Sequence, residues 1–408
     1  MDTTKPVVTD NAARVGATIL LCFLVTALEG FDIQVLGVVA PTLAPEFGLT
    51  PSQMGWMFSI GNIGLVFGAL TGGRLADLLG RKRLLIAATL LFGIATLAMS
   101  ACNSYWLLLV ARVVAGVGFG AALPNIMAII TELGIRVNRG ASLAVTMCGL
   151  PVGGSAVALV SQLLPHGVSW RLMFVLSGVL ALPIAAALWR WLPDTYRIRT
   201  AAGPGALPIA TTLFGEGRAP RTLLVWLAFA PLMATLYLIL NWLPLLATAK
   251  GLDANHAPQA LLAFNLTSIL GSVLIAAWID RAGRRWPVAL VTLALVLSLL
   301  FLARQSGSER LLLGAAATGF CLMGLVFALY AISALQYPLR GRGTGSGIAA
   351  AVGRLGSVSG PLVAGWLLDA GSSATQVLQL LVPVVAVAGA ALFALSLLDP
   401  RNALEDSV

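Results

Sequence analysis

The chain consists of long apolar runs that are separated by short polar connections. Twelve of these runs reach the length of about 20 mainly apolar residues that a helix needs to cross a bilayer. They are longer than barrel strands and do not alternate with a period of two, so a closed β-barrel is excluded. The sequence therefore predicts an all-α membrane protein with 12 transmembrane helices, at residues 15–40, 51–73, 84–101, 105–131, 140–164, 170–192, 222–248, 257–279, 287–303, 310–335, 343–368 and 375–398.

The composition excludes several classes of soluble protein. Of the 408 residues, 59% are hydrophobic and 10% are charged, whereas a soluble domain has about 25% charged residues. A soluble enzyme, a nucleic-acid-binding module or a disordered scaffold of this composition would have more apolar surface than it can hide from water. We therefore expect the lipid bilayer, and no nucleic acid, as a partner, in spite of the net charge of +9.

The basic residues predict the orientation of the chain. Lys and Arg gather in the cytoplasmic connections of membrane proteins. With the N-terminus inside, 19 of the 25 Lys and Arg residues lie in cytoplasmic segments, four lie in outer segments, and Arg112 and Arg354 lie within spans. The first apolar run lacks a small-residue cleavage site at signal-peptide length, so we expect it to remain attached as a span. Both termini are predicted to be cytoplasmic.

The longest connection and a short repeat divide the chain into two halves. Residues 193–221 are rich in Gly, Pro and Arg and follow the sixth span, so they are predicted to be a cytoplasmic linker between bundles at residues 1–192 and 222–408. Residues 77–81 read Asp-Leu-Leu-Gly-Arg and residues 280–284 read Asp-Arg-Ala-Gly-Arg, so Asp, Gly and Arg recur at an offset of 203. Such repeats indicate a transporter whose two bundles rock around a site at the midplane.

The sequence shows neither a metal site nor a catalytic group. The four cysteines lie in apolar stretches without the spacing of metal ligands, and the two histidines form no cluster. A membrane-embedded enzyme would need a polar catalytic cluster at membrane depth. We therefore expect no enzyme, no metal and no organic cofactor.

The connection after the second run carries a recognisable motif. Residues 73–83 read Gly-Arg-Leu-Ala-Asp-Leu-Leu-Gly-Arg-Lys-Arg. Their spacing, their position after the second span and the weaker copy after the eighth span resemble the signature of the major facilitator superfamily. Leu78 departs from the pattern, because that position is often basic in the family. The resemblance implies two pseudo-symmetric bundles of six helices.

The charges of this motif fit a cytoplasmic gate. Asp77 opposes the positive-inside pattern, and the N-terminus of the helix predicted at residues 343–368 favours an anion by a few tenths to about 1 kcal/mol. Arg81 is placed to reach Glu132 at the inner end of the fourth span. The alternative is that these charges only set the topology. The predicted gate residues are Gly73, Asp77, Gly80, Arg81, Glu132, Asp280 and Arg284.

The first span contains two acidic residues, Glu29 and Asp32, which share one helix face. A charge at this depth costs about 2.5–3.5 kcal/mol on insertion scales, so such residues usually line a functional cavity. The motif Glu-Gly-Phe-Asp resembles the Asp-Gly-Phe-Asp signature of the aromatic acid:proton symporters, with Glu in place of the first Asp. Residues 353–356 (Gly-Arg-Leu-Gly) add to the match. Residues 116–125 and 241–244 are most similar to those of the 3-(3-hydroxyphenyl)propionate transporters.

The resemblance implies a proton-coupled symporter that imports an aromatic carboxylic acid, a hydroxyphenylpropionate or a hydroxybenzoate, by alternating access. Arg354 is the candidate for the substrate carboxylate, because a guanidinium binds it with two parallel hydrogen bonds. The alternative is a pair with another group of the protein. Arg112 is expected to pair with the acids of the first span. Glu29, Asp32 and Arg112 are the predicted proton-coupling residues, and the sequence leaves open which acid carries the proton and whether one or two protons cross.

The other predicted substrate-binding residues are polar or aromatic side chains within the spans. Hydrogen bonding between helices is the alternative role of the polar ones, and an anchor at the membrane surface is the alternative role of the Trp. The full set of substrate-binding candidates is Asp32, Asn125, Asn241, Trp242, Tyr330, Gln336 and Arg354.

One rival function shares the predicted fold. Proton-driven drug exporters of the superfamily carry a Gly-Pro-x-x-Gly-Gly element in the fifth span, whereas residues 149–154 read Gly-Leu-Pro-Val-Gly-Gly, an imperfect match. The acid pair at residues 29 and 32 favours import. We expect a multi-pass protein of the bacterial inner membrane that functions as a monomer, with protons as the coupling ion.

Overall fold

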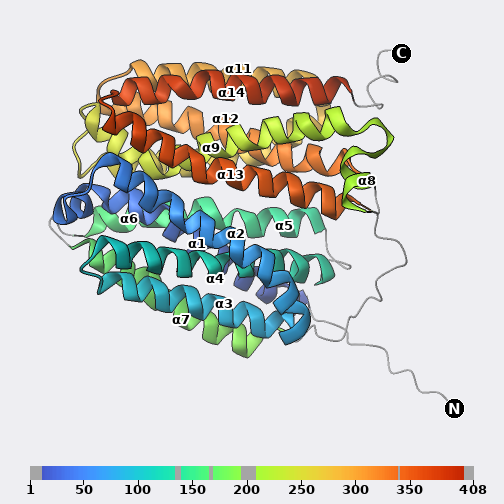
Figure 1. Ribbon diagram of the computed structural model, residues 1–408, viewed down its shortest axis with the longest axis horizontal. Coiled ribbons are helices and arrows are strands. Elements are labelled where there is room, and N and C mark those ends of the chain that lie inside the picture. The colour runs from blue at the N-terminus through green and yellow to red at the C-terminus, as the bar shows by residue number, and fades with distance from the viewer. Residues whose placement is uncertain (1–11, 134–138, 165–168, 194–207, 339–340, 399–408) are drawn as a thin grey trace.

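A computed structural model describes residues 12–133, 139–164, 169–193, 208–338 and 341–398. Twelve helical segments of this part of the chain are long and apolar enough to cross a membrane. They run side by side along one axis (Figure 1). The prediction of an all-α membrane protein with 12 spans is confirmed.

The helices of the first half form the first six spans, those of the second half form the last six, and two short elements lie between them. The first half contains α1 (Ala12–Phe47), α2 (Pro51–Leu79), α3 (Arg81–Ser100), α4 (Tyr105–Leu133), α5 (Arg139–Met147), α6 (Gly149–Leu163) and α7 (Trp170–Trp191). The short elements are α8 (Ile209–Phe214) and the 3-10 helix η1 (Gly215–Gly217). The second half contains α9 (Ala219–Ala249), α10 (Ala257–Ala282), α11 (Arg285–Arg304), α12 (Ser308–Leu335), α13 (Arg342–Asp369) and α14 (Ala374–Leu397).

The fifth span is interrupted at Cys148, between α5 and α6, where the sequence predicts one continuous run over residues 140–164. Pro151 explains the interruption. It has no backbone N–H, so the carbonyl of Met147, four residues earlier, loses the partner that a helix would supply. The two pieces still cross the membrane as one span.

The two halves repeat one packing scheme. In the first half, α2 packs against α4, α1 against α6 and α3 against α7, and in the second half α10 packs against α12, α9 against α13 and α11 against α14. Each pair of the second half thus corresponds to a pair six spans earlier. Figure 1 shows the first half as the lower layer and the second half as the upper layer.

Glycines permit the tight packing of equivalent helix pairs. A Cβ atom on Gly120 of α4 would overlap the backbone carbonyl of Leu65 in α2, and one on Gly319 of α12 would overlap that of Phe264 in α10. Lipid tails are as apolar as the helices, so no hydrophobic effect drives helices together within the membrane. Close backbone contact through glycine supplies the packing energy instead.

Helices α2 and α13 join the two halves at one end of the molecule. Ser59 Oγ donates a hydrogen bond to the carbonyl of Val358 over 2.7 Å, and Asn62 Nδ2 donates to the carbonyl of Ser357 over 3.3 Å. Farther along the same end, Ser52 Oγ donates to Asp369 Oδ2 over 2.5 Å. The charge distribution predicts this end to be the outer one.

Side-chain amides join the halves at a second place. Asn265 Nδ2 in α10 donates to Gln34 Oε1 in α1 over 2.6 Å, and both side chains are buried. Gln259 Nε2 in α10 donates to Gln162 Oε1 in α6 over 3.3 Å. A Cβ on Gly154 of α6 would overlap the Gln34 amide, so this glycine leaves the space through which Gln34 reaches the second half.

The same two helices, α2 and α13, separate toward the predicted cytoplasmic end. Gly73 lies 11 residues after Asn62 and Gly347 lies 11 residues before Val358, which is about three turns along the same helix faces. A Cβ on either glycine would have no described atom within 4 Å. The two halves therefore meet at the predicted outer end and diverge at the predicted cytoplasmic end.

The repeated motif forms the same backbone turn in both halves. Gly80 ends α2 with φ 86°, and Gly283 ends α10 with φ 72°. Residues with a Cβ rarely adopt these angles, so glycine is required at both positions for the chain to turn into the next span. The offset of 203 residues in the sequence thus reflects a repeated local structure.

Gly80→Ala should lower the stability of the protein by about 1–3 kcal/mol, the cost of strained backbone angles. Gly73→Ala is the matched control, because this glycine lies in the same helix and its Cβ would have no described atom within 4 Å. Thermal unfolding of the purified protein in detergent measures both effects. Equal loss of stability in the two variants would contradict the turn requirement at Gly80.

Candidate substrate and proton site

The two acids of α1 lie deep inside the protein. Glu29 is 1% exposed and Asp32 is 5% exposed. They sit near the middle of the helix, where α1 passes between α6 of its own bundle and α9 of the other bundle. A carboxylate at such a place requires a positive partner or a proton.

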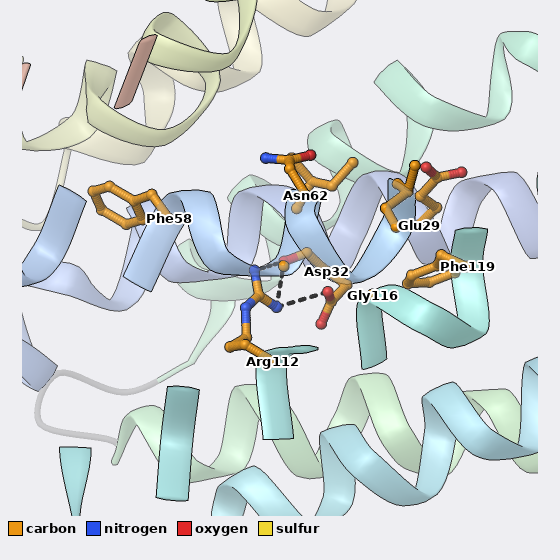
Figure 2. Close-up of a pocket in the computed structure, with 10 residues that line it drawn as sticks. Glu29, Asp32, Phe58, Asn62, Arg112, Gly116 and Phe119 are labelled. Carbon is orange, nitrogen blue, oxygen red and sulfur yellow. Dashed lines mark hydrogen bonds and ion pairs between the residues drawn. The ribbon is translucent and has the colours of Figure 1, made fainter. Parts of the chain in front are cut away.

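Arg112 of α4 supplies the partner of Asp32. Its Nη1 donates to Asp32 Oδ2 over 2.7 Å, and Nη1 and Nη2 both lie 3.3 Å from the backbone carbonyl oxygen of Asp32. The two side chains are 5% and 7% exposed. Figure 2 shows Arg112 directed at Asp32, whereas the Glu29 carboxylate points away from it. The expected pairing of Arg112 with an acid of the first span is thus present, and the acid is Asp32.

A cavity of about 20 Å³ lies beside this ion pair, lined by Glu29, Asp32, Phe58, Asn62 and Arg112 among others (Figure 2). A cavity needs about 10–15 Å³ for one water molecule. The space therefore suits a water and not an aromatic acid.

Arg354 of α13 lies on the other side of the junction between the halves. Its Nη1 donates to the hydroxyl of Tyr237 in α9 over 2.7 Å. Arg354 is half-buried, and Tyr237 is 4% exposed. The charges of Arg354 and Glu29 attract each other across the junction. A guanidinium thus stands in each half: Arg112 is in contact with Asp32, and Arg354 exerts an electrostatic attraction on Glu29.

Aromatic side chains surround Arg354 and the junction. Tyr330 of α12, which is 42% exposed, packs edge to face against Phe229 of α9 at 5.0 Å between ring centres. Trp242 of α9 packs in the same way against Phe58 of α2 at 5.1 Å, so this contact joins the halves. These rings can pack against the ring of a bound aromatic molecule.

Trp242 does not anchor the protein at the membrane surface. It is 2% exposed, and its Nε1 donates to the carbonyl of Pro361 in α13 over 3.0 Å. The neighbouring Asn241 is 1% exposed and donates from Nδ2 to the carbonyl of Tyr237 over 2.7 Å. Its Oδ1 has no described hydrogen-bond partner, and this buried acceptor is available to a donor such as a ring hydroxyl.

Comparison with known proteins assigns the family. A sequence profile of the Major Facilitator Superfamily matches residues 22–271 and 259–407. The chain is 37% identical, over 97% of each chain, to the 3-(3-hydroxy-phenyl)propionate transporter of Escherichia coli (strain K12). The chain belongs to the major facilitator superfamily. It is also 31% identical to the gallate transporter of Pseudomonas putida, over 88% of this chain and 87% of the relative.

Solved structures of the superfamily show the same fold. A bacterial homologue of the human lysosomal transporter Spinster, in an inward-facing and occupied conformation, aligns with a TM-score of 0.76 and 17% identity, over 95% of this chain and 97% of that chain. The D-xylose-proton symporter aligns with a TM-score of 0.75 and 17% identity, over 94% and 96%. As a member of the superfamily, the chain is a multi-pass membrane transporter and not an enzyme.

The structure does not place two of the predicted substrate residues beside Asp32 or Arg354. Asn125 Nδ2 donates to the backbone carbonyl of Arg81 over 2.6 Å, and Asn125 lies 13 residues, or about 20 Å, along α4 from Arg112. Gln336 caps the end of α12 and donates to the carbonyl of Ile332 over 3.3 Å. The contact of Asn125 is of the interhelical kind that the sequence leaves open as its alternative role.

The structure describes the side chains of some residues of the superfamily motif and not those of others. Gly73, Asp280 and the two turn glycines are described, and Gly73 and Asp280 are exposed. Arg81 is half-buried at the start of α3, and Arg284 follows the second turn. The side chains of Asp77 and Glu132 lie outside the described residues, so the predicted contacts of the gate stay predictions.

Tyr237 contacts Arg354 but is not among the site residues that the sequence predicts. It holds Arg354 through a direct hydrogen bond and lies one turn before Asn241 on the same face of α9. The i, i+4 spacing of a Tyr and an Asn within an apolar run is the signal that marks it.

Asp32→Asn should destabilise the protein by about 3–5 kcal/mol, because it leaves the Arg112 charge buried and unpaired. The double variant Asp32→Asn, Arg112→Gln removes both charges and should recover most of this loss. Thermal unfolding in detergent measures the difference. If the single and the double variant unfold at the same temperature, the ion pair does not stabilise the first bundle.

Proposed function

We propose that the protein is a proton-coupled symporter that imports an aromatic carboxylic acid, a hydroxyphenylpropionate or a hydroxybenzoate, across the bacterial inner membrane. The observation that carries the proposal is the group formed by the buried Glu29, Asp32 and Arg112 and the half-buried Arg354 at the junction of the two bundles. Bacterial relatives with 30% identity or more are named as transporters of a hydroxyphenylpropionate, gallate, 4-hydroxybenzoate and gentisate.

The chemistry of the cluster suits this class of substrate. An aromatic carboxylic acid has a pKa near that of Glu, about 4.3, and is almost entirely an anion at pH 7. Arg354 offers a guanidinium to the carboxylate, and its bond to Tyr237 fixes the direction of the side chain. Tyr330 and Phe229 supply apolar surface for the ring, and Asn241 supplies a hydrogen-bond acceptor.

Transport proceeds by alternating access. The bundles meet at the outer end and diverge at the inner end, so the described state is open toward the cytoplasm. The gate residues of the superfamily motif close the inner end when the bundles rock in the opposite direction. One chain holds both bundles and the whole site, so the monomer is the functional unit, and the protein needs no cofactor besides the coupling proton.

Uptake into proteoliposomes tests the proposal. Labelled 3-(3-hydroxyphenyl)propionate should accumulate when the outside is acidic, by up to tenfold per pH unit for one proton per anion. Unlabelled benzoates, cinnamates and phenylacetates compete in the order of their fit to the site. Without a gradient, the acid should only equilibrate. Extrusion of the acid against its gradient would instead support the exporter.

Arg354→Lys should weaken binding of the aromatic acid by about tenfold or more, because a lysine cannot form the paired hydrogen bonds of a guanidinium and a charged hydrogen bond contributes about 1.5–3 kcal/mol. The matched control is Arg310→Lys, an exposed arginine at the start of α12. Isothermal titration of the purified variants measures the affinities. Unchanged affinity of the Arg354 variant would remove this residue from the anion site.

A further inference from the structure

The two acids of α1 differ in the partner that faces them. Asp32 is in direct contact with Arg112, and both residues belong to the first bundle. When the bundles rock relative to each other, this pair moves as one body. Its contact therefore persists through the transport cycle.

Glu29 has no comparable contact. Its Oε1 is buried without a hydrogen-bond partner among the described residues. The positive charge that attracts it is that of Arg354, in the opposite bundle, and the described hydrogen bond of Arg354 goes to Tyr237. The charges of Glu29 and Arg354 thus offset each other without a described hydrogen bond between the two side chains. A substrate carboxylate can therefore bind Arg354 without breaking a direct ion pair.

The sum of the charges limits what this site can bind. Glu29 and Asp32 carry two negative charges, and Arg112 and Arg354 carry two positive charges, so the empty site is neutral. A bound aromatic carboxylate adds one negative charge. An uncompensated charge beside the buried side chains of Glu29, Asp32 and Arg112 is unfavourable, so the loaded site gains one positive charge.

We propose that Glu29 carries the coupling proton, that it and the substrate carboxylate alternate as the counter-charge of Arg354, and that one proton therefore crosses with each substrate anion. This inference rests on the proposed function. The proton comes from water and forms an O–H bond on the Glu29 carboxylate, and no bond of the substrate changes. The loaded and the empty site are both neutral, so transport moves no net charge.

The other titratable groups around Glu29 keep their charge state in this scheme. Asp32 of α1 is already paired with Arg112 of α4 at 2.7 Å, and this contact favours its ionised form. Tyr237 of α9 faces Glu29 and Arg354, and Tyr330 of α12 faces Tyr237 and Arg354. Tyrosine and arginine side chains ordinarily keep their protons near pH 7. Glu29 is the group left to take up the proton.

Proton uptake on substrate binding tests the assignment. Purified protein in weakly buffered detergent solution receives 3-(3-hydroxyphenyl)propionate, and a pH-sensitive dye reports the protons bound per substrate. The wild type should take up one proton, and its affinity should fall tenfold per pH unit above the range in which Glu29 is protonated. Glu29→Gln resembles the protonated residue, so it should take up none and bind with an affinity independent of pH.

Two further variants provide controls. Glu46→Gln removes an acid near the outer end of the same helix, where Glu46 binds Arg171, and should still take up one proton. Asp32→Asn, Arg112→Gln leaves Glu29 as the single acid of the cluster. Its turnover falls, but the ratio of one proton per bound substrate should remain, and this result does not depend on the folding of the Glu29 variant.

Each contrary result has a distinct meaning. Proton uptake by Glu29→Gln, or its loss in the double variant, would assign the proton to Asp32 and overturn the inference. If uptake by wild-type proteoliposomes responds to an imposed membrane potential, the stoichiometry of one proton per substrate anion is wrong. Counterflow of labelled acid into vesicles preloaded with unlabelled acid, without a proton gradient or membrane potential, separates these failures from that of the proposed function. A wild type that shows no counterflow does not transport the acid.

Discussion

A charge within a bilayer has no water around it, and the centre of this protein is organised by that constraint. Asp32 and Arg112 satisfy it inside one bundle, at 2.7 Å and almost fully buried. The bond also ties the middle of α1 to the middle of α4. Because both residues belong to the first half of the chain, the contact does not have to break if the two halves move relative to each other. The remaining charges of the site are positioned relative to this fixed pair.

The second bundle meets the first through a different kind of chemistry. Tyr237 directs Arg354 toward the junction, and Trp242 contacts Phe58 of the first bundle. These groups make few direct polar bonds to α1, so the junction can open without separating ions in contact. The repeated helix packing of the two bundles keeps each of them intact during such a movement, since the glycine contacts of α2 with α4 and of α10 with α12 are internal to one bundle.

The sequence predicts the spans and the family because hydropathy and the repeated loop motif are local properties. It also predicts that Arg112 meets an acid of the first span, because a buried guanidinium demands one. It does not show whether Glu29 or Asp32 is the partner. The two acids are three residues apart on one face of the helix, so the rotation of the helix in the bundle decides which of them contacts Arg112. Trp242 and Asn125 are of residue types that are common in binding sites. However, the contact of Trp242 with Pro361 and that of Asn125 with Arg81 are tertiary contacts, which no local sequence pattern predicts. The break at Cys148 follows from Pro151, which a hydropathy profile does not register.

The contacts that join the two halves at and near the predicted outer end are hydrogen bonds of polar side chains, among them the bond between Gln34 and Asn265. Each such bond contributes only about 0.5–1.5 kcal/mol net, because water takes over the donors and acceptors as soon as the joint opens. Opening this end therefore exchanges these hydrogen bonds for hydrogen bonds with water, and the charged group among them is Asp369, which accepts from Ser52. Because the partner of Asp369 is a neutral hydroxyl, salt should have little effect on the separation of the two halves at this end.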